Sequence, residues 1–215
     1  MICMNGGKYA KGRRHCYHIY WWLSRACYFW WPSYSYIKLV ILMTCIVAIS
    51  DNKKVYMGGE RGHSDSHTIV SSTRPKIFDV GSYLIGYAGN SGIGQAVVHN
   101  FKFPPLGKIS NIEKHMTSVI IPALRTFIKD SDIKMPENED DTASFVVGVK
   151  GRVYEIDMSD FQCIEYEEVC IGSGSGYAYG SLYSTKLNTP KDRIYTALNA
   201  AITYSPTCQG PVDYL

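Results

Sequence analysis

Apolar and polar positions after residue 43 follow a pattern that predicts strands in blocks and helices in pairs. In the first half, extended runs occupy residues 44–50, 55–57, 68–73, 76–80 and 83–88. The first two runs flank a polar turn and predict a hairpin. The next two lie on either side of Pro75 and predict a second pair of strands. The last run is closed by Gly89 and Asn90.

Helical spacing fills the middle of the chain. Residues 93–101 follow Ser91, which is a suitable N-cap. Residues 111–129 have an amphipathic helical pattern, but Pro122 lies inside it. Because proline has no backbone N–H to donate, we expect a kink at this point or a split near Ile121.

The second half of the chain returns to strands and then to a second pair of helices. Extended runs lie at residues 143–150, 153–157, 168–172 and 210–215, and helical runs lie at residues 176–184 and 191–203. Blocks of strands that alternate with pairs of helices favour an α+β layered sandwich over a doubly wound parallel sheet.

The composition separates the first 43 residues from the rest. The full chain has 215 residues, of which 46% are hydrophobic and 19% are charged, as is typical of a globular protein. Residues 1–43 contain six basic and no acidic residues together with all four tryptophans, so the remainder carries a net charge of −3. We therefore expect no nucleic-acid partner, because the remainder has no basic stripe or nucleic-acid motif.

Three interpretations of residues 1–43 stay open: an upstream extension from a misassigned start, a removable pro-segment, or a signal-anchor. Against the anchor, Lys38 divides the apolar run 26–49 into two pieces. Each piece is shorter than the ~20 residues that span a bilayer, so we expect no membrane association. Residues 44–215 then form one domain. Its cysteines show no Cys-x-x-Cys spacing, which indicates buried thiols in a reducing, cytoplasmic compartment.

Thr44 is the first candidate for chemistry because it follows Met43 at the head of an apolar strand. If translation begins at Met43, removal of that methionine exposes the α-amine of Thr44. A free α-amine can act as the base for the hydroxyl of the same residue. The structural alternative is an ordinary threonine inside a strand.

Glu60 and Lys76 are the next candidates. Glu60 ends the second strand of the first hairpin and can lie beside the start of the first strand, while Lys76 opens a later strand. A lysine stabilises an alkoxide and lowers the pKa of a neighbouring α-amine, and a carboxylate keeps that lysine charged and oriented. Taken alone, the two residues are equally consistent with an ordinary ion pair.

Five stretches together resemble the proteasome β-subunit family of N-terminal-threonine hydrolases, which includes the bacterial two-component ATP-dependent peptidase. They occur in family order and cover essentially all of residues 44–215. The stretches are Thr44-Cys45-Ile46-Val47-Ala48, Met57-Gly58-Gly59-Glu60-Arg61, Lys76-Ile77-Phe78, Gly86-Tyr87-Ala88-Gly89 and Gly172-Ser173-Gly174-Ser175-Gly176-Tyr177-Ala178-Tyr179-Gly180. The resemblance implies a four-layer αββα sandwich, the N-terminal-nucleophile hydrolase fold, in which two packed sheets lie between pairs of helices.

The resemblance also implies a set of catalytic residues. Thr44 is the nucleophile, and its α-amine is the base, acting through a water molecule. Lys76 is the neighbouring charge, and Glu60 is its acidic partner. The backbone N–H of Gly89 forms the oxyanion hole, because a glycine lets the substrate carbonyl approach the main chain closely. Ser173 forms a hydrogen bond near the α-amine.

The chain departs from the family pattern in one stretch near the C-terminus and at Met43. Near the C-terminus, where family members often have an aspartate ahead of Ser-Gly-Gly, Ser205 stands at the acidic position, Cys208 at the serine and Gln209 at a glycine. A hydroxyl can orient the amine but supplies no charge, so weaker or differently tuned activity is expected. Met43 stands where pro-segments that cleave themselves usually have glycine, which favours a start at Met43 over a long self-cleaved leader.

The function implied is that of a threonine endopeptidase in a self-compartmentalised, homo-oligomeric ring. Its substrates are peptides or unfolded proteins, and an ATP-dependent unfoldase is the expected partner. Two alternatives remain. The chain is either a catalytically inactive structural ring subunit of the same fold, or an N-terminal-nucleophile amidohydrolase that acts on a small amide.

No metal or cofactor is expected. His63, Asp65 and His67 alternate and would share one face of a strand, but their serine and glycine neighbours suit a loop at the border of the substrate pocket. The glycine-rich stretches have neither the lysine nor the spacing of nucleotide-binding loops.

Overall fold

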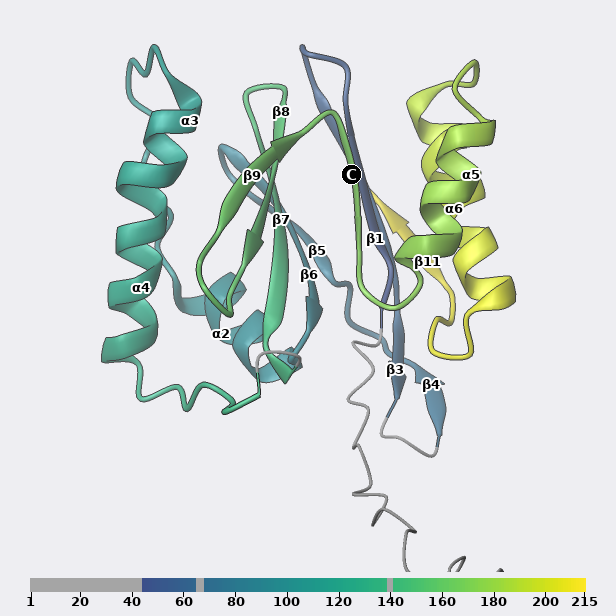
Figure 1. The fold of residues 1–215 in the computed structure, drawn as a ribbon, viewed down its shortest axis with the longest axis horizontal. Coiled ribbons are helices and arrows are strands. Elements are labelled where there is room, and N and C mark those ends of the chain that lie inside the picture. Colours follow the sequence, from purple (N-terminus) through teal and green to yellow (C-terminus); the bar gives the residue numbers. More distant parts are fainter. Residues whose placement is uncertain (1–43, 65–67, 139–140) are drawn as a thin grey trace, which may run out of the picture. The chain divides into compact units, whose positions relative to one another are not determined.

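The structure is a computed structural model and describes residues 44–215 except 65–67 and 139–140, so the interpretations of residues 1–43 lie outside the described part (Figure 1). The strands are β1 (Ile46–Ser50), β2 (Val55–Glu60), β3 (Gly62–Ser64), β4 (Ile69–Ser71), β5 (Ile77–Val80), β6 (Tyr83–Gly89), β7 (Ala143–Val149), β8 (Arg152–Asp157), β9 (Cys163–Tyr166), β10 (Glu168–Ile171) and β11 (Val212–Tyr214). The α-helices are α2 (Ser91–Asn100), α3 (Ile112–His115), α4 (Ile121–Asp130), α5 (Ser175–Ser184) and α6 (Pro190–Tyr204). Within the described residues, no helix is both long and apolar enough to cross a bilayer.

The elements form four layers. The five-stranded sheet β5-β6-β7-β8-β9 is covered on one side by α2, α3 and α4 (Figure 1). The four-stranded sheet β10-β1-β2-β11 is covered by α5 and α6. Between the sheets lies a third cluster of buried apolar side chains contributed by both of them. The predicted α+β four-layer αββα sandwich is thereby confirmed.

The burial of β1 on both faces explains why residues 45–49 form a continuous apolar run. Successive side chains of a strand point to opposite faces of the sheet. Cys45, Val47 and Ile49 pack toward α5 and α6, whereas Ile46 and Ala48 pack into the space between the sheets. A strand that is buried on both faces has no solvent-exposed positions to fill with polar residues.

The predicted pairing of residues 68–73 with residues 76–80 is wrong. β4 pairs with β3, and β5 pairs with β6, so the two segments belong to different sheets. Pro75 separates them because it has no N–H and restricts the residue before it. Gly81, at φ 69°, then allows β5 to turn directly into β6.

The long amphipathic segment is helical throughout but changes helix type before Pro122. A π-helical segment, η1 (Met116–Ile120), connects α3 to α4, and Pro122 lies in the first turn of α4. A proline is tolerated in the first turn of an α-helix, and the wider π-helical turn before it accommodates the backbone N–H that Pro122 lacks. The helix is therefore not split near Ile121 as one form of the prediction had it; it changes there from π-helix to α-helix.

Two local features differ from the sequence pattern. The N-cap of α2 is Asn90 and not Ser91, because the Asn90 side chain accepts hydrogen bonds from the backbone N–H groups of Gly92 and Ile93. The apolar-polar alternation in β9 is too short to predict as a strand, yet β9 extends the large sheet by pairing with β8.

A buried histidine connects the helical layer to the large sheet. His115, on α3, lies 3.0 Å from the hydroxyl of Tyr83 on β6, through its Nε2 atom. Burial lowers the pKa of His115 below its ordinary value of 6.5, and the positive charge of Lys150 adds to this effect. Burial also raises the pKa of Tyr83 to about 12, so the hydroxyl keeps its proton at neutral pH.

The lowered pKa of His115 predicts an acid-sensitive contribution to stability. Because the unfolded chain binds this proton more readily than the folded one, the free energy of unfolding should fall as the pH drops below 6.5. Compared by urea unfolding at about pH 7 and about pH 5, the wild type should lose more stability on acidification than His115→Gln. Equal losses in the two proteins would contradict this assignment.

Candidate active site

The first described residues of the chain meet the end of β2 and the start of β5. β1 and β2 pair in antiparallel register, so the end of β2 lies beside the start of β1. The N–H of Glu60 donates to the carbonyl of Cys45 at 3.3 Å. Lys76 immediately precedes β5 and reaches the same place. The fold therefore brings Thr44, Glu60 and Lys76 together from three separate segments.

Glu60 is a fully buried carboxylate with four donors. Oε1 accepts hydrogen bonds from the Cys45 N–H at 3.2 Å and from Lys76 Nζ at 2.9 Å. Oε2 accepts from the backbone N–H groups of Gly62 at 2.5 Å and Gln209 at 2.8 Å. With 0% of the residue exposed, these bonds replace the water that an ionised carboxylate requires. Through these bonds Glu60 connects its own strand to the segments that contain Cys45, Lys76 and Gln209.

Lys76 presents its ammonium group to the hydroxyl of Thr44. Nζ donates to Thr44 Oγ1, to Glu60 Oε1 and to the carbonyl of Gly62, which occupies all three of its N–H bonds. Lys76 is 7% exposed and Thr44 is 1% exposed. A fixed cation against a buried hydroxyl is the arrangement that stabilises an alkoxide.

A tight turn after β10 holds the other side of Thr44. Gly172 has φ 92°, and a methyl group there would lie 2.3 Å from the carbonyl oxygen of Thr44. Only glycine fits such a conformation and such a close approach. The N–H of Gly174 donates to the Thr44 carbonyl at 3.2 Å, and the N–H of Thr44 donates to Ser173 Oγ at 3.4 Å.

Ser173 continues into a row of hydroxyl groups. Its Oγ lies 2.5 Å from Thr207 Oγ1, which lies 2.9 Å from Ser205 Oγ. Sequence reasoning places Ser205 at the acidic position of the family but gives Thr207 no role. The signal for Thr207 is weak, because a lone threonine in a Ser-Pro-Thr-Cys turn looks like a turn residue.

Gly89 lies at the edge of this arrangement. It ends β6 opposite Ala143, has φ 91°, and follows Ala88, which is buried between the sheets. A methyl group at Gly172 would lie 3.3 Å from the Cβ atom of Ala88, so the end of β6 adjoins the turn at Gly172. The positive φ angle explains why a glycine is present at position 89. The role of its N–H in an oxyanion hole stays a prediction.

The cysteines near Thr44 are not strong nucleophiles at neutral pH. Burial raises the pKa of the Cys45 thiol well above its ordinary value, and the negative charge of Glu60 raises it further, against an opposing effect of Lys76. Burial likewise raises the pKa of Cys208. Both side chains are therefore protonated at neutral pH, and only thiolates are strong nucleophiles.

The described part of the chain does not test the His-Asp-His pattern. His63 lies on β3 and is exposed, whereas Asp65 and His67 are outside the described residues. Elsewhere in the described segments, no group of three or more His, Cys, Asp or Glu side chains is arranged to hold a metal ion.

A cavity adjoins Lys76. Its lining residues are Arg74, Pro75, Phe78, Tyr87, Gln95 and His99. Pro75 directly precedes Lys76, and the N–H of Tyr87 donates to the Lys76 carbonyl at 3.2 Å. Phe78 and Tyr87 stack with ring centroids 6.2 Å apart, so the cavity combines an aromatic wall with a guanidinium group.

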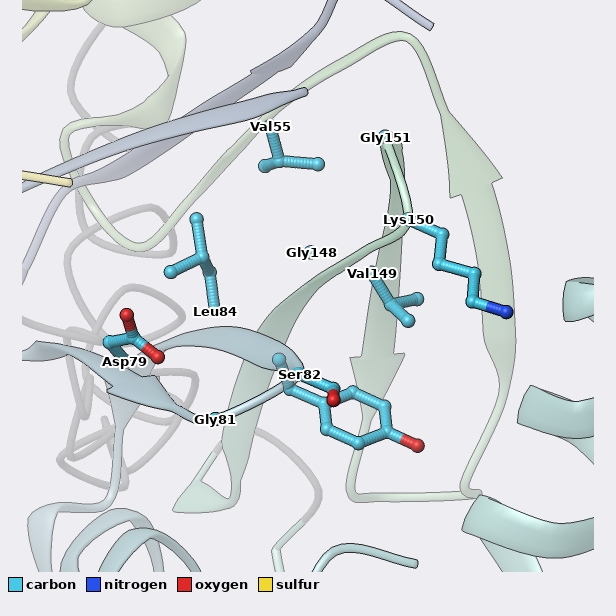
Figure 2. A pocket seen from close by; sticks show the side chains of 10 residues that line it. Val55, Asp79, Gly81, Ser82, Leu84, Gly148, Val149, Lys150 and Gly151 are labelled. Carbon is cyan, nitrogen blue, oxygen red and sulfur yellow. The ribbon is translucent and has the colours of Figure 1, made fainter. Parts of the chain in front are cut away.

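A second, smaller cavity lies at the other end of β6, lined by residues of the β5–β6 and β7–β8 turns (Figure 2). Tyr83 is at this cavity, whereas Gly89 is at the end of the strand beside Thr44. Tyr83 and Gly89 are six positions apart along an extended strand, which corresponds to roughly 20 Å. Asp79 and Lys150 lie on opposite sides of the cavity in Figure 2. The lining includes none of Thr44, Glu60 and Lys76, so the cavity is separate from the candidate site.

No family model matches the chain. Two curated proteins named proteasome subunit beta do. The one from Frankia casuarinae is 29% identical over 147 residues, and the one from Parafrankia sp. is 27% identical over 146 residues. Each alignment covers 65% of this chain and 53% of the relative. The chain thus spans about half the length of the curated relatives that it matches.

Solved structures share the fold. Thiobacillus denitrificans BPH in complex with epoxomicin has a TM-score of 0.67 and 13% identity, covering 80% of this chain and 97% of that one. Eukaryotic HslV from Trypanosoma brucei has a TM-score of 0.59 and 17% identity, covering 80% and 98%. At these identities the likeness is one of fold. Taken together, the curated relatives and the shared fold support the resemblance of this chain to the proteasome β-subunit family.

Proposed function

We propose that the chain is a threonine endopeptidase whose nucleophile is the hydroxyl of Thr44 at the N-terminus of the mature protein. One observation carries the proposal: the buried ammonium of Lys76 contacts Thr44 Oγ1 while Glu60 holds that ammonium in place. A threonine that serves only a strand does not need a buried ion pair directed at its hydroxyl.

The reaction follows from these groups. Thr44 Oγ attacks the carbonyl carbon of the scissile amide, and the hydroxyl proton passes to the α-amine through a water molecule. Lys76 stabilises the developing alkoxide, and the N–H of Gly89 stabilises the oxyanion of the tetrahedral intermediate. The C–N bond breaks, the leaving amine takes the proton, and an ester on Thr44 remains. A second water then attacks the ester carbonyl and loses its proton to the α-amine. The bond between the carbonyl carbon and Thr44 Oγ breaks, Oγ takes the proton back from the amine, and the acid leaves.

The proposal requires a free α-amine. While residue 43 stays attached, the nitrogen of Thr44 is an amide and cannot accept a proton at neutral pH. The active form must therefore begin at Thr44, whether residues 1–43 are a pro-segment or an untranslated extension. We further propose a homo-oligomeric ring that encloses the sites, an ATP-dependent unfoldase as partner, and a cytoplasmic location.

The relatives suggest a ligand and a substrate class. BPH forms a complex with epoxomicin, and we propose that epoxomicin binds the Thr44 site of this chain as well. The substrates proposed are peptides and unfolded proteins.

The cavity beside Lys76 is the proposed pocket for the substrate side chain that precedes the cleaved bond. Its aromatic wall accepts the stem of that side chain, and Arg74 selects a carboxylate at the tip. His99, edge-on to Phe78 with centroids 5.8 Å apart, completes the rim.

Arg74→Met should therefore change the cleavage preference. A charge-assisted hydrogen bond contributes about 1.5–3 kcal/mol, so kcat/KM for a peptide with glutamate before the cleaved bond should fall about 10- to 100-fold. The rate for the matching glutamine peptide should change little. Lys129→Met, an exposed substitution on α4, is the matched control. An equal loss of kcat/KM on the glutamate and glutamine peptides would show that Arg74 does not recognise the substrate carboxylate.

A substrate panel tests the function itself. Protein that begins at Thr44 is assayed with fluorogenic peptides, an unfolded protein and small amides. Cleavage of peptides supports the endopeptidase, whereas turnover of small amides alone supports the amidohydrolase alternative. Absence of all turnover in assembled protein would favour the inactive ring subunit.

A further inference from the structure

The row of hydroxyls beside Thr44 occupies the place where the family often has a carboxylate. Its members are Ser173, Thr207 and Ser205, and it continues to Cys208, whose thiol is hydrogen-bonded by Ser205 and Ser173. Thr207 is 7% exposed and Ser205 is 5% exposed, so neither hydroxyl can turn to bulk water. Buried hydroxyls must satisfy one another, which gives the row a direction.

The contacts at both ends of the row favour one direction. At one end the nitrogen of Thr44 donates to Ser173 Oγ at 3.4 Å, so Ser173 is the acceptor there. At the other end the backbone N–H of Thr207 donates to Ser205 Oγ at 3.4 Å, and Ser205 has the Cys208 sulfur as a hydrogen-bond partner. The single proton of Ser173 has the Thr44 carbonyl at 3.5 Å, the Cys208 sulfur and Thr207 Oγ1 at 2.5 Å as acceptors. The shorter of these two distances favours Thr207, whose own proton then goes to Ser205 Oγ.

We propose that Thr207 is a positioning residue for the Thr44 reaction: it accepts the proton of Ser173 and so keeps the Ser173 lone pair aimed at the α-amine. This inference rests on the proposed function of Thr44. A carboxylate at this place would stabilise the α-ammonium by its charge, whereas the hydroxyl of Thr207 does so by orienting Ser173. Without it, Ser173 can turn its proton toward the amine or toward the Thr44 carbonyl, which lies 3.5 Å away.

Several titratable groups lie around Thr44, and each of them must be the same in the wild type and in every variant that is compared. Lys76 and Glu60 lie on the side of β2 and β5, and Cys45 and Cys208 lie on the side of α5 and α6. A substitution at Thr207 leaves all four in place. A change in the titration of the amine therefore reports on the hydroxyl row.

The test uses Thr207→Val in protein that begins at Thr44, because valine keeps the shape and removes the hydroxyl. We expect kcat to fall about tenfold with little change in KM, as for a misplaced catalytic group. The acidic limb of the kcat profile should move about half a pH unit lower, because the ammonium form loses its acceptor. Thr207→Ser should restore both values. Thr203→Val, which removes an exposed hydroxyl bonded to the Asn199 carbonyl, should change neither.

A second measurement does not depend on activity. In protein labelled with ¹⁵N-threonine, the chemical shift of the Thr44 amine is followed against pH. The midpoint should be lower in Thr207→Val than in the wild type and normal in Thr207→Ser. Unchanged midpoints would overturn the inference while leaving the endopeptidase intact. An inactive wild type with a shifted midpoint would overturn the endopeptidase and keep the hydroxyl row.

Discussion

Replacing Thr44 by alanine is expected to lower peptidase turnover by roughly three orders of magnitude or more, since the nucleophile itself is removed. The comparison uses protein that begins at residue 44, so that the free α-amine is present in both forms. Thr44→Ser keeps the hydroxyl beside Lys76 and should retain activity within about tenfold. The measurement is the single-turnover rate on the best peptide of the panel.

The Thr44→Ala protein also separates the endopeptidase from the inactive ring subunit. The small change in side chain should leave folding and assembly intact, which is checked by thermal unfolding and sedimentation. If Thr44→Ala and the wild type cleave peptides at the same rate, the nucleophile lies elsewhere and the chain at most has a structural role in a ring.

Glu60→Gln should be the most destabilising of the isosteric substitutions at the site. Glutamine offers one acceptor oxygen where the carboxylate receives four N–H donors, and it leaves the buried ammonium of Lys76 without a counter-charge. Breaking a buried ion pair by removing one partner costs about 3–5 kcal/mol. The free energy of unfolding from urea titration should fall by this amount, and turnover should be lost with it.

The matched control for this loss is Glu165→Gln. Glu165 pairs with Arg152 on the surface, where the two side chains are 33% and 38% exposed. It also accepts a hydrogen bond from the Tyr154 hydroxyl at 2.9 Å, and the carbonyl oxygen of glutamine can accept this bond as well. Exposed pairs of this kind contribute less than about 1 kcal/mol. Equal destabilisation by Glu60→Gln and Glu165→Gln would mean that the buried pair does not organise the site.

Much of the fold was predictable because the strands carry their own signals. The run in β1 is apolar on both faces, and Pro122 marks the change of helix type. Pairing was harder, because the pattern of residues 68–80 gives the strands but not their partners. β4 and β5 are each paired within a local hairpin, and only turn geometry at Gly81 distinguishes this from the pairing expected across Pro75.

The candidate site was predictable only where a residue has a family counterpart. Glu60 and Lys76 meet Thr44 as expected, since both follow from the order of the strands. Thr207 could not be predicted, because its contact with Ser173 joins residues 34 positions apart. The positioning role that we propose for it rests on burial and on the serine at position 205 in place of a carboxylate, and no local pattern reveals either.

The account rests on a hydroxyl and an amine that belong to the same terminal residue. The most direct test is intact-mass analysis of the catalytically active fraction, trapped with a slowly hydrolysed peptide ester. We predict a chain that begins at Thr44 and carries one acyl group, mapped by fragmentation to the Thr44 oxygen. An active fraction in which residue 43 is still attached, or an acyl group on any other side chain, would contradict the account.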